Sequence, residues 1–320
     1  MKEKHDKINR RNFLKTMGAV SVGSIFSSVS LKAKANDLNV TKKSQEAESQ
    51  QVPRRKLGKT GVKVPCLSLG IEFNAVENQT VLQKAVEFGV SYWDTAETYA
   101  GGNSALGIGK FLQKNPEMRE KLFIATKACR TKGSYDEGKP VPADRESCLQ
   151  ASLKRLKTEY IDLYYGFHGL SDPVHLTDEL KQWVKNAKER KLIRFFGFST
   201  HTNMAQCLTA AAKLDWIDAI MTAYNFRSMQ DSKMQAAIEA CHKVGIGLIA
   251  MKTQAFGQKF ETEEDKKLVE HLLQQGFTEG QAKIKVVLED KRFSSACVGM
   301  ENVALLTSNV AAAMNRTTLI

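Results

Sequence analysis

The sequence lacks the residue patterns that hold a metal or cross a membrane. Its six cysteines form no C-x-x-C pair, and the two closest lie 19 residues apart, which argues against metal-ribbon and cluster sites. The uncharged stretch Met17–Leu31 is rich in Gly and Ser. It is too short and too weakly apolar to span a hydrocarbon core of ~30 Å. A stable membrane span is therefore not expected.

Positive charge is abundant, but it is not concentrated on one face or motif of the chain. Residues 1–35 account for +6 of the formal net charge of +12, and the remaining residues carry the other +6 without an arginine stripe. Nucleic acid is therefore not expected as a partner. A content of 42% apolar and 26% charged residues excludes a disordered or collagen-like chain, and 320 residues allow one large barrel or two average domains.

The N-terminus has the three parts of an export signal. The basic segment Asn9-Arg10-Arg11-Asn12-Phe13-Leu14-Lys15 precedes the uncharged stretch, and Ala33-Lys34-Ala35 provides an A-x-A cleavage pattern. The paired arginines resemble the twin-arginine signals of bacteria, although Asn9 stands where those signals usually have Ser or Thr. We expect residues 1–35 to be a signal for the twin-arginine export machinery, residues 36–52 a flexible leader, and the protein to be periplasmic or otherwise exported. The alternative is a basic tail whose two arginines are adjacent by chance.

From Pro53 onward, short apolar runs alternate with amphipathic helical patterns. The expected strands are Cys66–Ile71, Ser91–Asp94, Leu122–Lys127, Ile161–Phe167, Ile193–Ser199, Ala219–Thr222, Gly247–Met251 and Ser295–Val298. Such alternation indicates right-handed βαβ units around a parallel sheet, and eight repeats suit a (β/α)8 TIM barrel of ~250 residues. We therefore expect residues 53–320 to form one α/β barrel, with a small N-terminal hairpin that caps the bottom.

The rival fold is a doubly wound sheet, which usually has about five to seven strands and a Gly-rich first turn. Gly107-Ile108-Gly109 opens a helix as a dinucleotide fingerprint would, but Leu112 occupies the position of the third glycine. A glycine-permissive loop is the simpler interpretation, and the barrel remains favoured.

Chemically active side chains follow three consecutive strands. Asp94, Lys127 and His168 stand at the ends of expected strands two, three and four, and Tyr99 lies five residues past Asp94. Because neighbouring parallel strands are ~4.8 Å apart, Asp94 and Lys127 are expected to form an ion pair, with His168 ~10 Å from Asp94. Taken singly, each residue has a structural explanation. Together, an acid, an ammonium, a phenol and an imidazole on one rim suit the transfer of a proton and a hydride.

Reduction of a carbonyl needs a hydride for the carbon and a proton for the oxygen. A free tyrosine, with a pKa of ~10, is a weak acid at neutral pH. An ammonium ~4 Å away favours the phenolate by at most about 4 kcal/mol at an effective dielectric constant of ~20, or about three pK units. We therefore expect the pKa of Tyr99 to lie near neutrality, with Asp94 orienting Lys127 and His168 donating to the substrate oxygen.

These residues lie in segments that resemble the aldo-keto reductases. Asp94-Thr95-Ala96-Glu97-Thr98-Tyr99 is similar to the D-T-A-x-x-Y segment of that family, Ile124–Lys127 to its third-strand lysine motif, and Ile161–His168 to its fourth-strand histidine motif. Arg55–Gly61 and Gly197–Ser199 also match, so the resemblance spans about residues 53–315. It implies that Asp94, Tyr99, Lys127 and His168 form a catalytic tetrad.

The resemblance also implies a nicotinamide cofactor, NADP or NAD, lying across the rim without a Rossmann domain, and a small carbonyl or alcohol as substrate. Ser199 would hold the carboxamide. Met251 would lie where the family stacks an aromatic ring on the nicotinamide, with Lys252 beside it. The segment from Gly299 to Asn309 would wrap the adenosine end, and it includes Met300, Glu301 and Asn302.

The fourth-strand motif departs from the family pattern by one residue. His168 follows Asp162 by six residues, where the family has five. Because side chains alternate along a strand, the extra residue would turn the imidazole to the opposite face. We predict a β-bulge at Gly166, which would absorb the additional residue and redirect His168 to the rim.

The cofactor segment departs as well. Glu301 stands where the family commonly has an arginine for the 2′-phosphate of NADP, and a carboxylate there would repel a phosphate. NAD is therefore a candidate beside NADP. Met221 stands where a carboxamide-binding glutamine is often found, and the short tail after the last helix predicts an open substrate site.

There are two alternatives to an oxidoreductase. The first is a cofactor-sensing or partner-binding barrel without turnover, which Glu301, Met221 and the shifted histidine favour. The second is a barrel hydrolase or lyase, which would need metal-binding histidines or paired carboxylates that the rim does not supply. Because the cell envelope holds little free nicotinamide cofactor, an exported enzyme is expected to carry its cofactor pre-loaded.

Overall fold

The computed structural model describes residues 51–128, 144–257 and 259–319. The expected signal, residues 1–35, and most of the expected leader lie outside these described residues. Val52 is buried and its backbone N–H donates to the carbonyl of Phe88, 3.0 Å away. The packed part of the chain therefore includes Val52, one residue before the expected start of the barrel.

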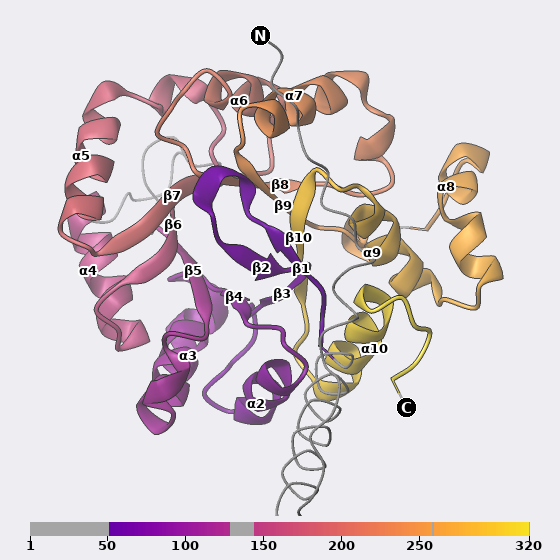
Figure 1. Ribbon diagram of the computed structural model, residues 1–320, viewed down its shortest axis with the longest axis horizontal. Coiled ribbons are helices and arrows are strands. Elements are labelled where there is room, and N and C mark those ends of the chain that lie inside the picture. The colour runs from indigo at the N-terminus through magenta and orange to yellow at the C-terminus, as the bar shows by residue number, and fades with distance from the viewer. Residues whose placement is uncertain (1–50, 129–143, 258, 320) are drawn as a thin grey trace, which may run out of the picture. The chain divides into compact units, whose positions relative to one another are not determined.

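Eight parallel strands close into a barrel in the order β10-β3-β4-β5-β6-β7-β8-β9, as predicted (Figure 1). The strands are β3 (Leu67–Gly70), β4 (Tyr92–Asp94), β5 (Phe123–Lys127), β6 (Ile161–His168), β7 (Ile193–Thr200), β8 (Ala219–Ala223), β9 (Gly247–Met251) and β10 (Phe293–Gly299). Each expected strand coincides with one of them. The (β/α)8 fold is confirmed, and the doubly wound sheet is excluded.

The strands are apolar throughout because both faces of the sheet are buried. Tyr92, Leu163 and Tyr165 belong to a cluster in the barrel interior, whereas the neighbouring Trp93 and Tyr164 pack against the helices. This alternation follows from the period of two along a strand. It also determines which strand-end residues can face the mouth of the barrel.

Helices surround the strands, as Figure 1 shows. They are α2 (Gln79–Glu87), α3 (Asn103–Lys114), α4 (Arg145–Leu156), α5 (Asp178–Glu189), α6 (Met204–Ala211), α7 (Ser232–Lys243), α8 (Glu263–Gln274), α9 (Glu279–Glu289) and α10 (Val303–Ala313). Among the described residues, no helix has the length and apolar character needed to cross a membrane. Helices α8 and α9 begin with capping boxes, at Thr262 and Thr278.

The glycines that imitate a dinucleotide fingerprint lie inside helix α3 and not in a loop. A Cβ atom on Gly107 would come within 2.3 Å of the Ala75 backbone, and one on Gly109 within 2.3 Å of the Arg155 carbonyl. These glycines therefore let α3 pack closely against its neighbours, and they do not form a phosphate-binding turn.

A two-stranded hairpin closes the N-terminal end of the barrel. Strands β1 (Arg54–Lys56) and β2 (Lys63–Pro65) pair antiparallel, as expected, and Leu57 and Val64 are fully buried in the interior cluster. Gly247, the first residue of β9, leaves the space that Leu57 fills. The hairpin thus plugs the interior at this end, and the mouth of the barrel lies at the C-terminal ends of the strands.

Candidate active site

A pocket of about 450 Å³ opens at the C-terminal ends of the strands. Its lining comes from the ends of most strands and the loops after them: Gly70, Glu72, Thr98, Tyr99, His168, His201, Met221, Met251, Lys252, Thr253, Gln254, Gly257, Cys297, Val298 and Gly299. The volume lies within the range of small-molecule sites. This is the end of the barrel at which the sequence placed the chemistry.

Asp94 and Lys127 form a buried ion pair beneath the pocket. They end the neighbouring strands β4 and β5, and their side chains are 3% and 1% exposed. The Lys127 ammonium donates to Asp94 Oδ1 and, over 3.1 Å, to the Thr95 carbonyl. Although burial alone would lower the pKa of Lys127, the Asp94 carboxylate raises it above the ordinary lysine value. Lys127 therefore stays charged, as predicted.

Tyr99 lies directly above this pair, at the start of the short 3-10 helix Tyr99–Gly102 that follows β4. The Lys127 Nζ atom is 4.6 Å from the centre of its ring. Burial raises the pKa of the phenol above its usual value, and the ammonium of Lys127 offsets this only in part. The expectation of a pKa near neutrality is therefore wrong. It counted the ammonium but left out the desolvation of the phenol and the opposing charge of Asp94.

His168 reaches the pocket through a β-bulge in β6. Tyr165 pairs with Gly197 and His168 pairs with Ser199. His168 is three residues beyond Tyr165 on β6, whereas Ser199 is only two residues beyond Gly197 on β7, so β6 contains one extra residue. The predicted irregularity around Gly166 is thus confirmed. A side chain at Gly166 would force the Phe196 ring to move, since a Cβ atom would approach that ring to 2.4 Å. The bulge turns His168 towards Tyr99, whose ring it meets edge-on with centroids 5.5 Å apart.

Three of the expected cofactor residues line the pocket: Met251, Lys252 and Gly299. Lys252 has a left-handed backbone, with φ of 56°, and its carbonyl accepts a hydrogen bond of 3.2 Å from the Asn225 side chain. Its ammonium lies 3.7 Å from the carboxylate of Glu72, which follows β3. A charged pair therefore lies at the rim and joins the loops after β3 and β9, the two strands that flank β10.

The other expected cofactor residues lie outside the pocket lining. Ser199 is fully buried, and its hydroxyl donates to the Phe167 carbonyl at 3.3 Å. Met300 packs into the outer hydrophobic layer. Glu301 is exposed.

The remaining two of these residues belong to helix α10. Asn302 caps its N-terminus by accepting a hydrogen bond of 2.9 Å from the Leu305 N–H. Asn309 is 4% exposed, so it offers little surface to a ligand.

Glu72, His201 and Gln254 line the pocket but were not identified from the sequence. His201 follows the last residue of β7, so a search extended one residue beyond each strand would have found it. Burial and the positive charges of Lys252 and Lys127 lower the pKa of His201 to about 4. Its imidazole is therefore neutral at physiological pH and can exchange hydrogen bonds without adding charge.

Apart from Cys148, the cysteines of the described part behave as packing residues. Cys66, Cys207, Cys241 and Cys297 are free and buried. Cys297 lines the pocket, but burial raises the pKa of its thiol, which disfavours the reactive thiolate. Cys148 is disulfide-bonded.

Together the fold and the rim residues define a (β/α)8 barrel with a cluster of titratable side chains at its C-terminal end. Residues 67–315 match the model of the Aldo/keto reductase family, and the chain belongs to that family.

A curated relative and two solved structures show the extent of the similarity. The uncharacterized oxidoreductase YqkF of Bacillus subtilis (strain 168) is 33% identical over 157 residues, which cover 46% of this chain and 48% of that protein. The chain thus matches about half the length of this relative. The holo form of aldo-keto reductase AKR11C1 from Bacillus halodurans superposes with a TM-score of 0.65, at 21% identity, over 84% of this chain and 93% of that one. The thermostable aldo-keto reductase Tm1743, in complex with the inhibitor epalrestat, gives 0.65 at 26% identity, over 82% and 94%.

Proposed function

We propose that the protein is an oxidoreductase that transfers a hydride between a nicotinamide cofactor and a carbonyl or alcohol substrate. The observation that carries this proposal is the meeting of Asp94, Lys127, Tyr99 and His168 at one pocket. Membership of the aldo-keto reductase family and the similarity to an oxidoreductase support it.

The residues at the mouth fit a nicotinamide dinucleotide. The pocket is large enough for the nicotinamide end. Apart from its chain neighbours, no described residue has an atom within 4 Å of where a Cβ on Gly299 would stand, so the rim is open on that side. Lys252 supplies a cation for the phosphates, and Met251 an apolar surface for the ring. When bound, the cofactor would supply or accept the hydride. NAD(P) is therefore compatible with the described lining.

Tyr99 is the proton donor in this proposal. Its raised pKa keeps the phenol protonated at neutral pH, so a proton is available for the oxygen of a carbonyl that gains a hydride. Lys127, held by Asp94, stabilises the phenolate left behind, and His168 donates a hydrogen bond to the same substrate oxygen. In the reverse reaction the phenolate of Tyr99 would accept the proton of an alcohol that gives up a hydride.

The substitution Tyr99→Phe tests the role of the phenol. We expect it to lower kcat for aldehydes and ketones by about 10²–10⁴-fold, because general acid catalysis contributes that much. Tyr160→Phe, at the opposite end of the barrel, is the matched control and should retain full activity. Unchanged turnover in Tyr99→Phe would remove Tyr99 from the mechanism.

A cofactor-sensing barrel without turnover is the second candidate, and Glu301 and Met221 favour it. It predicts that the unaltered protein binds NADPH or NADH but reduces no member of a broad panel of aldehydes and ketones. Detectable reduction that Tyr99→Phe abolishes would eliminate the sensor.

The choice between NADP and NAD rests on Glu301. Its exposed carboxylate lies just before helix α10, where it disfavours a 2′-phosphate, so we propose NAD as the better cofactor. Dissociation constants for NADH and NADPH, measured by fluorescence, decide this. Tighter binding of NADPH would contradict the charge argument.

We also propose export through the twin-arginine pathway, on the Arg10-Arg11 pair and the A-x-A pattern. The disulfide at Cys148 suits an oxidising compartment. The double variant Arg10→Lys/Arg11→Lys should remain in the cytoplasm of its host, whereas Lys2→Arg/Lys4→Arg should be exported normally.

An exported enzyme is also proposed to carry its cofactor from the start, so mass spectrometry of the exported protein should find a bound dinucleotide. Its absence would contradict pre-loading.

A further inference from the structure

A second pocket lies at the opposite end of the barrel, where the strands begin. This basal pocket has a volume of about 500 Å³ and is lined by Arg55, Lys56, Gly58, His242, Gly245, Ile246, Lys291, Arg292 and Ser294. These residues come from the hairpin, the α7–β9 junction and the α9–β10 junction. The pocket shares no residue with the active-site pocket.

The lining of the basal pocket is basic. Five of its nine residues are Arg, Lys or His, and none is Asp or Glu. Within the described part of the chain, Arg55, Lys56 and Lys291 make no ion pair with a carboxylate; Lys291 reaches only the Leu288 carbonyl, at 3.4 Å. Among the described residues, no carboxylate therefore lies within ion-pair distance of these three cations.

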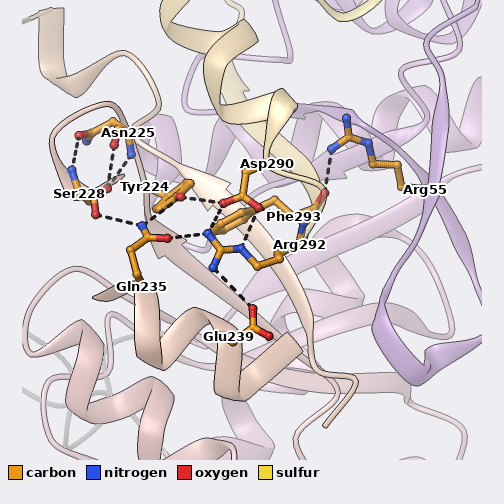
Figure 2. Close-up of polar contacts among 9 residues, drawn as sticks. All are labelled: Arg55, Tyr224, Asn225, Ser228, Gln235, Glu239, Asp290, Arg292 and Phe293. Carbon is orange, nitrogen blue, oxygen red and sulfur yellow. Dashed lines mark hydrogen bonds and ion pairs between the residues drawn. The ribbon is translucent and has the colours of Figure 1, made fainter. Parts of the chain in front are cut away.

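Arg55 is fixed in place although it lacks a carboxylate partner. Its guanidinium donates to the carbonyls of Phe293, at 2.9 Å, and Leu288, at 2.5 Å. Figure 2 shows Arg55 reaching the Phe293 carbonyl from the hairpin. The remaining donors of this planar, permanently charged group are held in a defined orientation, which suits recognition of an oxyanion.

Arg292 forms the other wall and is compensated. It donates to Asp290 over 2.6 and 2.9 Å and to Gln235 over 2.6 Å, and it lies 3.7 Å from Glu239 (Figure 2). Tyr224 completes this network: its hydroxyl donates to Asp290 over 2.7 Å and accepts from the Gln235 amide over 3.2 Å. This network makes the wall rigid. Among the described residues, the cations of the pocket without a carboxylate partner are therefore Arg55, Lys56 and Lys291.

In another pocket at this end of the barrel, most of the cations are paired with carboxylates. It is lined by Tyr160, Lys188, Lys191, Ile193, Arg194 and Phe195. There, Lys188 pairs with Asp218 and Arg194 with Asp162, at 2.5 Å each. Carboxylates thus already neutralise two of its three cations. In the basal pocket the like charges also affect the adjacent Lys285, whose pKa is lowered by burial and further by Lys291 and Arg55, against the opposing effect of Glu289.

We propose that the basal pocket binds a ligand bearing two or more phosphate groups, held by Arg55, Lys56 and Lys291. A single phosphate would satisfy the remaining donors of Arg55 but leave the two ammonium groups without a counter-ion. Two linked phosphates can contact all three cations. Such a group can belong to a soluble molecule or to an anionic surface of headgroups, and both have the same oxyanion chemistry.

Calorimetric titration of the full chain with inorganic pyrophosphate tests the proposal. The double variant Lys56→Gln/Lys291→Gln removes two exposed charges from the pocket. The control Lys114→Gln/Lys121→Gln removes two exposed charges elsewhere. We expect the unaltered protein and the control to bind pyrophosphate, and the pocket variant to bind it at least about tenfold more weakly. Binding should weaken as salt is added.

A second arm uses vesicles that contain phosphatidylglycerol in a neutral lipid. Vesicle binding that the pocket variant loses, without pyrophosphate binding, would support the proposal and assign the site to a surface of headgroups. Thermal unfolding of each variant confirms that it is folded. If no probe binds, or if the pocket variant binds as tightly as the control, the proposal is overturned. The second result would place the anion at another site, the active-site pocket included.

Discussion

Replacement of Lys127 by Met should separate the structural role of the buried ion pair from its catalytic role. The substitution keeps most of the volume and leaves Asp94, 2% exposed, without its cation. Asp94 Oδ2 already has no hydrogen-bond partner within the described residues, so no second group replaces the ammonium. Loss of one partner of a buried pair costs about 3–5 kcal/mol. For a domain of this size, that corresponds to a fall in Tm of roughly 6–20 °C.

Urea unfolding at several pH values measures this effect. Burial already raises the pKa of Asp94, and loss of Lys127 removes the charge that opposes the rise. A carboxyl whose pKa is higher in the folded than in the unfolded protein destabilises the fold most at pH values above both pKa values, where both states are ionised. The destabilisation disappears at acid pH, where both states are protonated. The deficit in unfolding free energy of Lys127→Met should therefore shrink as the pH is lowered from about 8 towards about 5.

The double variant Asp94→Leu/Lys127→Met is the control. Removing both charges should restore much of the stability, since an apolar pair is often as stable as a buried ion pair. Carbonyl reduction should be lost in the single and in the double variant. The reasoning is refuted if Lys127→Met unfolds at the same urea concentration as the unaltered protein, or if its deficit grows at acid pH.

Three further substitutions test other parts of the structure. Gly166→Ala should destabilise the protein by about 1–3 kcal/mol in urea unfolding and lower kcat, because its Cβ would meet a phenyl ring at 2.4 Å. The control Gly280→Ala, in helix α9, should be neutral or stabilising. Equal unfolding free energies for the two variants would contradict the close packing at the bulge. Glu301→Arg should tighten NADPH relative to NADH by about tenfold or more in fluorescence titrations; an unchanged ratio would remove this position from the cofactor site. Arg292→Met should destabilise the protein at neutral pH. Because the Arg292 hydrogen bonds help to lower the pKa of Asp290 against the effect of burial, this loss should diminish on acidification, and a loss that is constant with pH in urea unfolding would contradict the link.

The strand ends show how far the sequence alone could reach. Asp94 and Lys127 each end an apolar run, and consecutive strands in a barrel are neighbours, so their contact follows from local pattern and connectivity. The direction of the His168 side chain depended on two further facts: side chains alternate along a strand, and a glycine such as Gly166 can form a bulge. The observed bulge agrees with that inference. These inferences succeeded because each depends on residues close together in the chain.

Other features were decided by atoms that the chain brings together from a distance. The Tyr99 phenol has a raised pKa because the fold removes water from it and places Asp94 beside Lys127. The Ser199 hydroxyl is engaged by a carbonyl of the neighbouring strand. In the basal pocket, Arg55 and Lys291 meet although 236 positions separate them in the sequence.

The amino-acid sequence by itself determined the barrel, the order of its strands and the placement of Asp94, Tyr99, Lys127 and His168 at one end of it. Periodicity and turn residues encode these locally. Only the tertiary structure decided the protonation of Tyr99, the residues that line each pocket and the cations left without a partner. Desolvation and electrostatic interaction depend on distances through space, and a linear pattern does not contain those distances.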